Sequence, residues 1–267
     1  MVNKSLHLHR WFRGSWFAQE WAGAYNGATA LLACGGPSLR DWPREAMEAP
    51  GVLLCSLNNA ASHARPHLWF TGDRPASFCP QLTRDPGVVK LARMDGAASR
   101  LPGAGPQWGR LPGTWFYEPE LREGMDGMFW ESPKVPYMLN TLAAAAHMLW
   151  AMGVARVVLA GCDLGGSAEY FHGHPPTGGR SEANLRLYAQ QRAFLRSLAP
   201  SARRAGLELV DCSPSRPLAP EWPSAGMLEG LSMCLEGYPA GPCDHSALPH
   251  GADAWDAARL DEGEWAL

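Results

Sequence analysis

The stretch Ala28-Thr29-Ala30-Leu31-Leu32-Ala33-Cys34-Gly35-Gly36-Pro37-Ser38-Leu39 decides how the chain is interpreted. Its first seven residues carry no charge and predict a buried strand, and two glycines then end the run. Pro37 and Ser38 suit the first turn of a helix, where proline has no amide hydrogen to lose. The free N–H groups of a helix start attract anions, so the stretch fits either a phosphate-binding turn or an ordinary strand-to-helix connection.

The composition is typical of a globular domain. The chain has 267 residues, of which 46% are apolar, and this is enough to bury a full core. A formal net charge of −3 gives no overall attraction to nucleic acid or to an anionic membrane. The cysteines form no disulfide framework, and the first residues lack the apolar segment of a signal peptide. We therefore expect a cytoplasmic protein.

One uncharged segment, residues 135–155, is long enough to suggest a membrane span. It contains Pro136, Asn140 and His147, and it runs directly into a strand-like sequence. A helix buried against a sheet explains these features better, so no membrane span is predicted.

Strand-like and helix-like segments alternate between residues 28 and 215. Short apolar runs predict strands at 28–34, 51–57, 67–71, 88–93, 155–161 and 206–211. Helices are predicted at 38–48, 137–152 and 181–204. Apolar strands that alternate with helices form parallel sheets covered on both faces. The predicted fold class is therefore α/β and Rossmann-like, with a mostly parallel sheet and helices on both faces.

Three regions fall outside this alternation. Residues 1–27 are predicted to form an irregular arm, whose tryptophans and basic residues either pack on the domain or contact nucleic acid. Residues 96–134 are predicted to be an irregular insertion in the domain at 28–215. Residues 216–267 are interpreted as a tail rich in proline, glycine and acidic residues.

Glycines and polar residues follow most of the predicted strands. They are Gly35 and Gly36 after the first strand, Asn58 and Asn59 after the second, Asp73 after the third, Asp163 after the fifth and Ser213 after the last. In an open α/β sheet ligands bind beyond the carboxyl ends of the strands, so this arrangement predicts a binding site. Turns attract the same residue types, which is the simpler alternative.

A loop that contains His172 and His174 follows Asp163. Two histidines one residue apart, with a carboxylate upstream, suit a metal site, but no third ligand stands at a typical spacing. A loop histidine beside a nucleotide could instead deprotonate an acceptor hydroxyl, because the pKa of histidine lies near neutrality. A solvated loop histidine is the third alternative.

Four motifs of this chain occur in the same order as in a known group of similar enzymes. They are Ala33–Leu39, Asn58-Asn59, Asn140-Thr141 before an alanine-rich helix, and Gly161-Cys162-Asp163. In this order they resemble the bacterial lipooligosaccharide sialyltransferases, the motility accessory factor glycosyltransferases and the MptE-like 6-hydroxymethylpterin diphosphokinases. The resemblance spans residues 28–215 and implies a Rossmann-like catalytic domain that uses a nucleotide.

The sialyltransferase resemblance implies a metal-independent glycosyltransferase that needs no cofactor beyond its nucleotide-sugar donor. The residues that it assigns to the donor are Gly35, Gly36, Ser38 at the helix start, Asn58 or Asn59, and Asn140 with Thr141. It implies His174 as the catalytic base and Tyr170 as the group that steadies the departing phosphate. Gly35 and Gly165 stand where that family has an asparagine and a tyrosine, which argues against sialic acid as the sugar.

The diphosphokinase resemblance implies different chemistry in the same pocket. ATP would lie on the turn from Gly35 to Ser38, and Asp73 and Asp163 would hold Mg²⁺ through carboxylate oxygens. A hydroxyl group of a small acceptor would then attack the β-phosphorus.

We therefore predict a nucleotide-dependent transferase. The leading hypothesis is transfer of a sugar to an acceptor hydroxyl, and the alternative is Mg²⁺-dependent transfer of pyrophosphate from ATP. A modified DNA base is one candidate acceptor, since it would join the basic arm to the pocket. The second alternative is a non-catalytic module for nucleic-acid binding or assembly.

Overall fold

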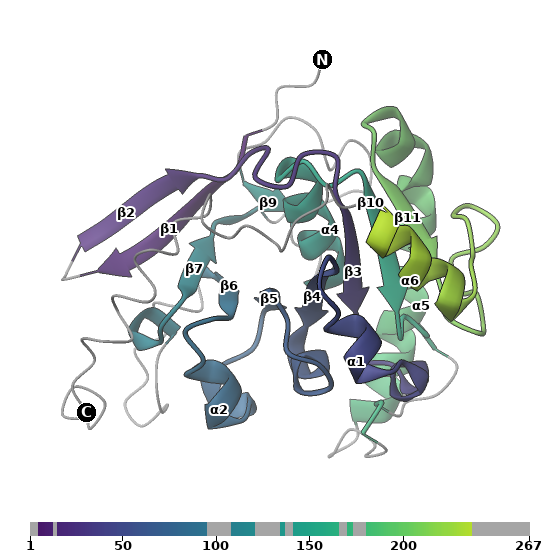
Figure 1. Ribbon diagram of the computed structural model, residues 1–267, viewed down its shortest axis with the longest axis horizontal. Coiled ribbons are helices and arrows are strands. Elements are labelled where there is room, and N and C mark those ends of the chain that lie inside the picture. The colour runs from purple at the N-terminus through teal and green to yellow at the C-terminus, as the bar shows by residue number, and fades with distance from the viewer. Residues whose placement is uncertain are drawn as a thin grey trace.

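A nine-stranded sheet forms the centre of the molecule (Figure 1). The computed structural model describes residues 5–12, 15–94, 108–120, 134–136, 141–165, 170–172 and 180–236. The strands of the sheet follow the order β11-β10-β3-β4-β5-β6-β7-β1-β2. Neighbouring strands from β11 to β7 are parallel, whereas β1 is antiparallel to both β7 and β2.

The strands that the sequence predicts are all present. The sheet consists of β1 (His7–Phe12), β2 (Ser15–Glu20), β3 (Thr29–Ala33), β4 (Leu53–Leu57), β5 (Leu68–Thr71), β6 (Val89–Arg93), β7 (Thr114–Tyr117), β10 (Arg156–Ala160) and β11 (Glu208–Asp211). The α-helices are α1 (Arg44–Met47), α2 (Pro80–Thr83), α4 (Thr141–Ala151), α5 (Arg180–Arg204) and α6 (Met227–Glu236). Short 3₁₀ helices are η1 (Pro37–Asp41), η2 (Asn58–Ser62), η3 (Pro75–Ser77) and η4 (Trp108–Arg110), and β8 (Pro119–Glu120) pairs with β9 (Val135–Pro136). The α/β, Rossmann-like fold is confirmed.

The central strands are apolar throughout because helices cover both faces of the sheet (Figure 1). In β3, Ala30 and Leu32 belong to the core that includes α4 and α5, whereas Leu31 and Ala33 belong to the core that includes α1 and α6. Successive side chains of a strand point to opposite faces. A strand covered on both faces therefore needs an uninterrupted apolar run, which is the pattern that predicted it.

The N-terminal region is a hairpin, not the irregular arm that the sequence suggested. β1 pairs with β2 along its whole length and joins the sheet through a pairing of His9 with Phe116 of β7. All six residues of β2 are exposed. An edge strand without a buried face has no reason to alternate apolar and polar residues, so its sequence lacks the usual strand pattern. Trp21 just beyond the hairpin is buried, while Trp16 remains 46% exposed.

The single helix predicted at 38–48 is instead two short helices. η1 ends at Asp41, and α1 begins at Arg44. Trp42 between them has extended backbone, with φ −81° and ψ 122°. The ring of the following Pro43 disfavours helical backbone in the residue before it, and this separates the two helices.

Two further regions are more regular than predicted. Within the supposed insertion, Thr114–Tyr117 forms β7, a fully buried strand of the sheet. Within the supposed tail, Met227–Glu236 forms α6, which buries Leu231 and Cys234 against the sheet. Both elements are short and are flanked by glycine and proline, which hid them from pattern analysis. The remainder of these two regions lies largely outside the described residues.

The uncharged segment 135–155 contributes most of its length to α4, in which every residue from Leu142 to Ala151 is buried. Among the helices that the structure describes, none combines the length and the apolar character needed to cross a bilayer.

Candidate functional site

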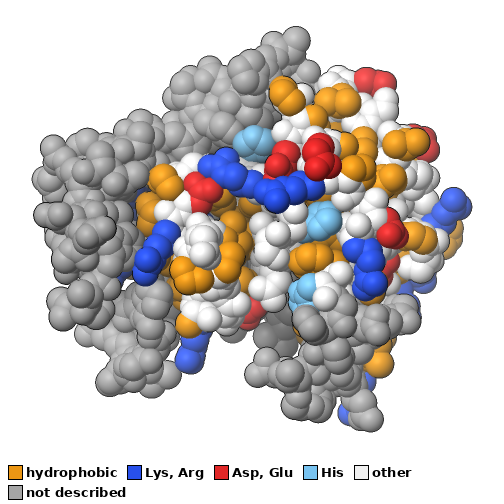
Figure 2. Space-filling model, turned by 60° about the horizontal axis from the view of Figure 1, so that its bottom comes forward, with side chains coloured by type: hydrophobic (Ala, Val, Ile, Leu, Met, Phe, Trp, Pro, Cys, Tyr) orange, Lys and Arg blue, Asp and Glu red, His pale blue; other side chains and the backbone are white. Residues whose placement is uncertain are grey.

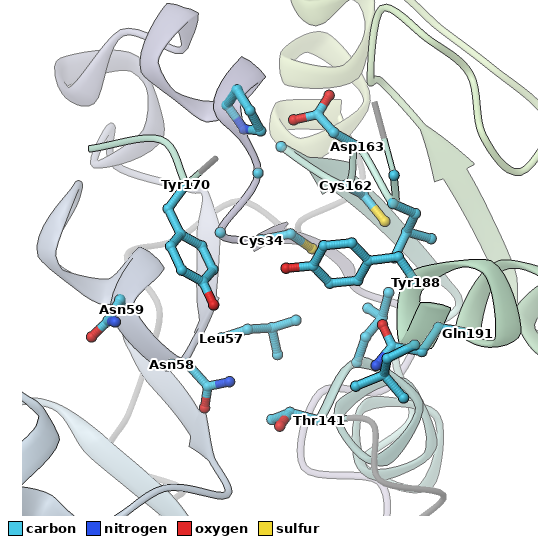
Figure 3. Close-up of a pocket in the computed structure, with 18 of the residues that line it drawn as sticks. Cys34, Leu57, Asn58, Asn59, Thr141, Cys162, Asp163, Tyr170, Tyr188 and Gln191 are labelled. Carbon is cyan, nitrogen blue, oxygen red and sulfur yellow. The ribbon is translucent and has the colours of Figure 1, made fainter. Parts of the chain in front are cut away.

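The order of the strands changes direction at β3. From β3 the chain continues to β4 on one side, and it later returns to β10 on the other side. Parallel sheets bind ligands outside the carboxyl ends of the strands at such a point, because the two connections leave in opposite directions and open a crevice. A pocket of about 350 Å³ lies at this point (Figure 3).

Most of the predicted binding residues line this pocket. They are Gly35, Gly36, Asn58, Asn59, Asp73, Thr141, Asp163 and Tyr170. They come from segments that follow β3, β4, β5 and β10, and from the start of α4. Ser38 is not part of the lining. Asn140 and His174 lie outside the described residues, so their predicted roles stay predictions.

The turn after β3 is locked to the end of β10 by Asp163. Oδ2 of Asp163 accepts hydrogen bonds from the backbone N–H of Ser38, at 2.8 Å, and from its hydroxyl, at 3.0 Å. The anion at this helix start is therefore a carboxylate of the protein itself. Ser38 was expected to help bind phosphate, but its backbone N–H already has this partner.

Gly36 lies in the same contact between the turn after β3 and the end of β10. A Cβ atom at Gly36 would collide with Oδ2 of Asp163 and would lie 2.6 Å from the carbonyl oxygen of Gly161. The Gly36 N–H also donates to that carbonyl at 2.9 Å. This glycine is required because two turns of the protein meet there, which is a packing requirement and not evidence of a ligand.

Gly35 differs from Gly36, because it faces open space and the ring of Tyr170. A Cβ atom at Gly35 would lie 3.7 Å from the ring of Tyr170, which is an ordinary contact distance. The carbonyl of Gly35 accepts a hydrogen bond from the N–H of Phe171 at 3.1 Å. The segment around Tyr170 is thereby attached to the turn and forms one side of the pocket (Figure 3).

Asn58 and Asn59 follow β4 but are held differently. Asn58 has a positive φ of 43°, which is uncommon for residues other than glycine and which asparagine tolerates best. Its carbonyl accepts a hydrogen bond from Trp69 at 2.9 Å, and its side-chain oxygen lies 3.4 Å from the N–H of Gly72. Asn59 is exposed, so its amide is placed at the open side of the pocket.

The wall opposite the strand ends comes from α5, which sequence analysis did not assign to the site. Leu187, Tyr188 and Gln191 of this helix line the pocket. The sequence predicts a helix at 181–204 and assigns none of its residues to the site. Position 191 lies three and four residues after 188 and 187, so it neighbours both on one side of the helix, which is the signal that could have identified them.

The phenol of Tyr188 points toward Tyr170 across the pocket (Figure 3). Burial, followed by the proximity of Tyr170 and the hydrogen bond between the two side chains, raises the pKa of Tyr188 to about 12. The phenol of Tyr188 is therefore neutral at physiological pH. A neutral phenol can donate a hydrogen bond to a ligand oxygen or to the partner tyrosine.

Two buried thiols lie on the floor of the pocket, at the ends of β3 and β10. Both cysteines are free, and their thiols are close enough to interact. The interaction with Cys34, together with burial, raises the pKa of Cys162 well above that of an ordinary thiol. Because the thiolate is the reactive form, the raised pKa makes the Cys162 thiol a poor nucleophile at neutral pH.

The described residues do not form a complete Mg²⁺ site by themselves. Asp73 and Asp163 both line the pocket, but Oδ2 of Asp163 is bound to Ser38. Within the described part of the chain, no group of three or more His, Cys, Asp or Glu side chains is arranged to hold a metal ion. Mg²⁺ is usually held by one or two carboxylates together with waters and substrate phosphates, so the predicted role of Asp73 and Asp163 in the diphosphokinase alternative stays a prediction.

Comparison of the chain with protein-family models, curated proteins and solved structures found no match. The resemblance to sialyltransferases, motility accessory factors and diphosphokinases therefore rests on the four sequence motifs.

Proposed function

We propose that this protein is a nucleotide-dependent transferase that moves a sugar from a nucleotide sugar to an acceptor hydroxyl. The observation that carries this proposal is the position of the pocket. It lies outside the carboxyl ends of β3 and β10, where the strand order changes direction, and it contains eight of the eleven residues expected in the site. Nucleotides are the ligands most typical of this place in an open α/β sheet.

The groups around the pocket suit a nucleotide. The amides of Asn59 and Gln191 can both donate to and accept from a base or a ribose. Thr141 begins α4, a helix of 11 residues, so the positive end of this helix lies at the pocket. A helix start favours a bound phosphate, and α4 provides one to the pocket in place of the start of η1.

Sugar transfer needs a base for the acceptor and a donor for the leaving group. The acceptor oxygen bonds to the anomeric carbon as the bond from this carbon to the phosphate oxygen breaks, and the hydroxyl proton passes to the base. The family resemblance gives the role of base to His174. The hydroxyl of Tyr170 lines the pocket beside Tyr188 and can donate a hydrogen bond to the departing phosphate.

A thermal-shift screen tests the proposal. Purified protein is heated with nucleotides and with nucleotide sugars, each in Mg²⁺ and in EDTA. A ligand that binds the native state raises the melting temperature, by an amount that follows its concentration relative to its Kd. We expect one nucleotide sugar to stabilise the protein equally in both conditions. That donor is then incubated with candidate hydroxyl acceptors, and release of the free nucleotide is measured.

Other outcomes of this screen contradict the proposal in defined ways. Stabilisation by ATP alone, lost in EDTA, would support the pyrophosphokinase and overturn the glycosyltransferase. The absence of a shift with every nucleotide would contradict both enzymes. DNA binding that Trp11→Ala and Arg10→Ala abolish would then support the non-catalytic module.

A further inference from the structure

The described lining of the pocket lacks a positive charge. Asp73 and Asp163 are its only charged side chains among the described residues, and neither Lys nor Arg is among the residues that line it. A nucleotide carries at least one negative phosphate, which the two carboxylates would repel. A pocket that takes a nucleotide therefore needs a cation close to its edge.

Arg192 supplies such a cation. A Cβ atom at Gly165 would lie 3.8 Å from a terminal guanidinium nitrogen of Arg192 and 3.9 Å from Cβ of Tyr188. Gly165 and Tyr188 both line the pocket. The guanidinium thus lies against the backbone at the edge of the pocket, one helical turn along α5 from Tyr188 and next to Gln191.

Arg192 differs from Arg196 and Arg203 of the same helix, because no acceptor for its guanidinium is found among the described residues. On the face shown in Figure 2, several basic side chains lie beside acidic ones. On α5 itself, Arg196 donates to the carbonyl of Pro217, and Arg203 donates to the carbonyl of Glu221. Arg192 is partly buried, and the described part of the chain offers its guanidinium neither a hydrogen bond nor an ion pair. A guanidinium that lies at the pocket edge without an acceptor among the described residues can donate to an anionic ligand.

We propose that Arg192 binds the phosphate of the nucleotide in this pocket. The inference rests on the proposed function and names the group that recognises the charged part of the donor. The planar guanidinium can donate two parallel hydrogen bonds to two phosphate oxygens. The phosphate then lies between the edge of α5 and the start of α4, with the base and ribose on the asparagine side.

The test compares nucleotides with the nucleosides that lack the phosphate. Binding of CMP, UDP, GDP and ADP and of cytidine, uridine, guanosine and adenosine is measured by calorimetry for the wild type, Arg192→Gln and Arg186→Gln. Arg186 lies on the same helix, is exposed and does not line the pocket, so it is the matched control. We expect Arg192→Gln to weaken binding of the preferred nucleotide about 10- to 100-fold, as for loss of a charged hydrogen bond. Binding of its nucleoside and the melting temperature should change little.

Three results would overturn the inference. Equal weakening of nucleotide and nucleoside by Arg192→Gln would mean that the side chain shapes the pocket and does not bind phosphate. Unchanged binding of both nucleotide and nucleoside in Arg192→Gln would remove Arg192 from the site while leaving the proposed function intact. The absence of binding by the wild type to every nucleotide and nucleoside would contradict the proposed function, and the inference with it.

Discussion

The two walls of the pocket are built in different ways. The wall of strand ends is tied together by the protein's own groups: Gly36 touches Gly161, and Asp163 accepts from Ser38. The wall from α5 presents Leu187, Tyr188 and Gln191, with Arg192 at its edge, and among the three polar residues only Tyr188 has a side-chain interaction that the structure assigns. Polar groups in the first wall serve mainly the architecture. We propose that those in the second wall bind the ligand.

A glycine turn and an aspartate at the ends of strands are therefore weak evidence for a ligand by themselves. The motif residues Gly36, Ser38 and Asp163 satisfy one another. The pocket they border is nonetheless real, because the turns hold β3 and β10 in the arrangement that opens it. Substitutions in the first wall should therefore change stability, and substitutions in the second should change binding.

Gly36→Ala is expected to have the largest effect. The new Cβ atom would collide with Asp163 and press on the Gly161 carbonyl, both of which are fixed by their own hydrogen bonds. The free energy of unfolding should fall by about 3 kcal/mol, measured by chemical denaturation. Gly35→Ala is the matched control, since its Cβ has room at 3.7 Å from Tyr170, and it should change stability by less than about 1 kcal/mol. Equal losses of stability for the two substitutions would show that Gly36 is packed no more tightly than Gly35.

A double-mutant cycle of Ser38→Ala and Asp163→Ala measures the interaction of these two side chains directly. The hydroxyl of Ser38 donates to the carboxylate at 3.0 Å, so each single variant should lose stability and the double variant should lose less than their sum. A coupling free energy of about 1–2 kcal/mol is expected for a partly buried hydrogen bond to a charged group. Additive effects would mean that the Ser38 hydroxyl is not bound to Asp163 in solution and remains available to a ligand.

Gln191→Ala should weaken nucleotide binding without destabilising the protein. The Gln191 amide lines the pocket, and loss of one neutral hydrogen bond corresponds to about a 3- to 10-fold rise in Kd. Gln190→Ala is the control, because Gln190 is the adjacent, exposed residue of α5 and does not line the pocket. Calorimetric titration with the nucleotide found in the screen gives Kd. A large drop in melting temperature for Gln191→Ala would instead show that this side chain stabilises the fold, as the polar groups at the strand ends do.

The smallest effect is expected from alkaline pH acting on Tyr188. Its pKa is raised to about 12 in the folded protein, above the value of about 10 for a free tyrosine. The folded state thus holds this proton more tightly, and the resulting stability is present below pH 10 and is lost as the pH rises through 12. Denaturation at pH 9 and pH 11.5 should show a smaller loss of stability for Tyr188→Phe than for the wild type. An equal loss in both proteins would show that Tyr188 titrates normally.

The sequence predicted the central part of the fold because a strand buried on both faces needs an uninterrupted apolar run. The runs at 28–34 and 155–161 are uncharged or nearly so, and they became β3 and β10. β2 has no such apolar run, because all six of its residues are exposed. β7 is only four residues long and lies among glycines and prolines. Pattern analysis detects burial on a regular element and misses elements that are short or exposed.

The candidate site was predictable in part for a related reason. Residues that follow strands converge at one edge of a parallel sheet, so the positions of Gly35, Asn59 and Asp163 could be inferred from order alone. The α5 residues could not, since a helix can rotate any face toward the sheet. Tyr188 and Arg192 were indistinguishable in sequence from a core residue and a solvated charge.

The sequence by itself determined which segments are buried, in which order they alternate, and that glycines and polar groups stand where strands end. Only the tertiary structure decided what those groups contact. Ser38 and Asp163 are 125 residues apart, and their hydrogen bonds exist because β3 and β10 are neighbours in the sheet. The local sequence pattern reflects whether each residue is buried. A polar contact instead depends on the positions of two segments that are far apart in the sequence.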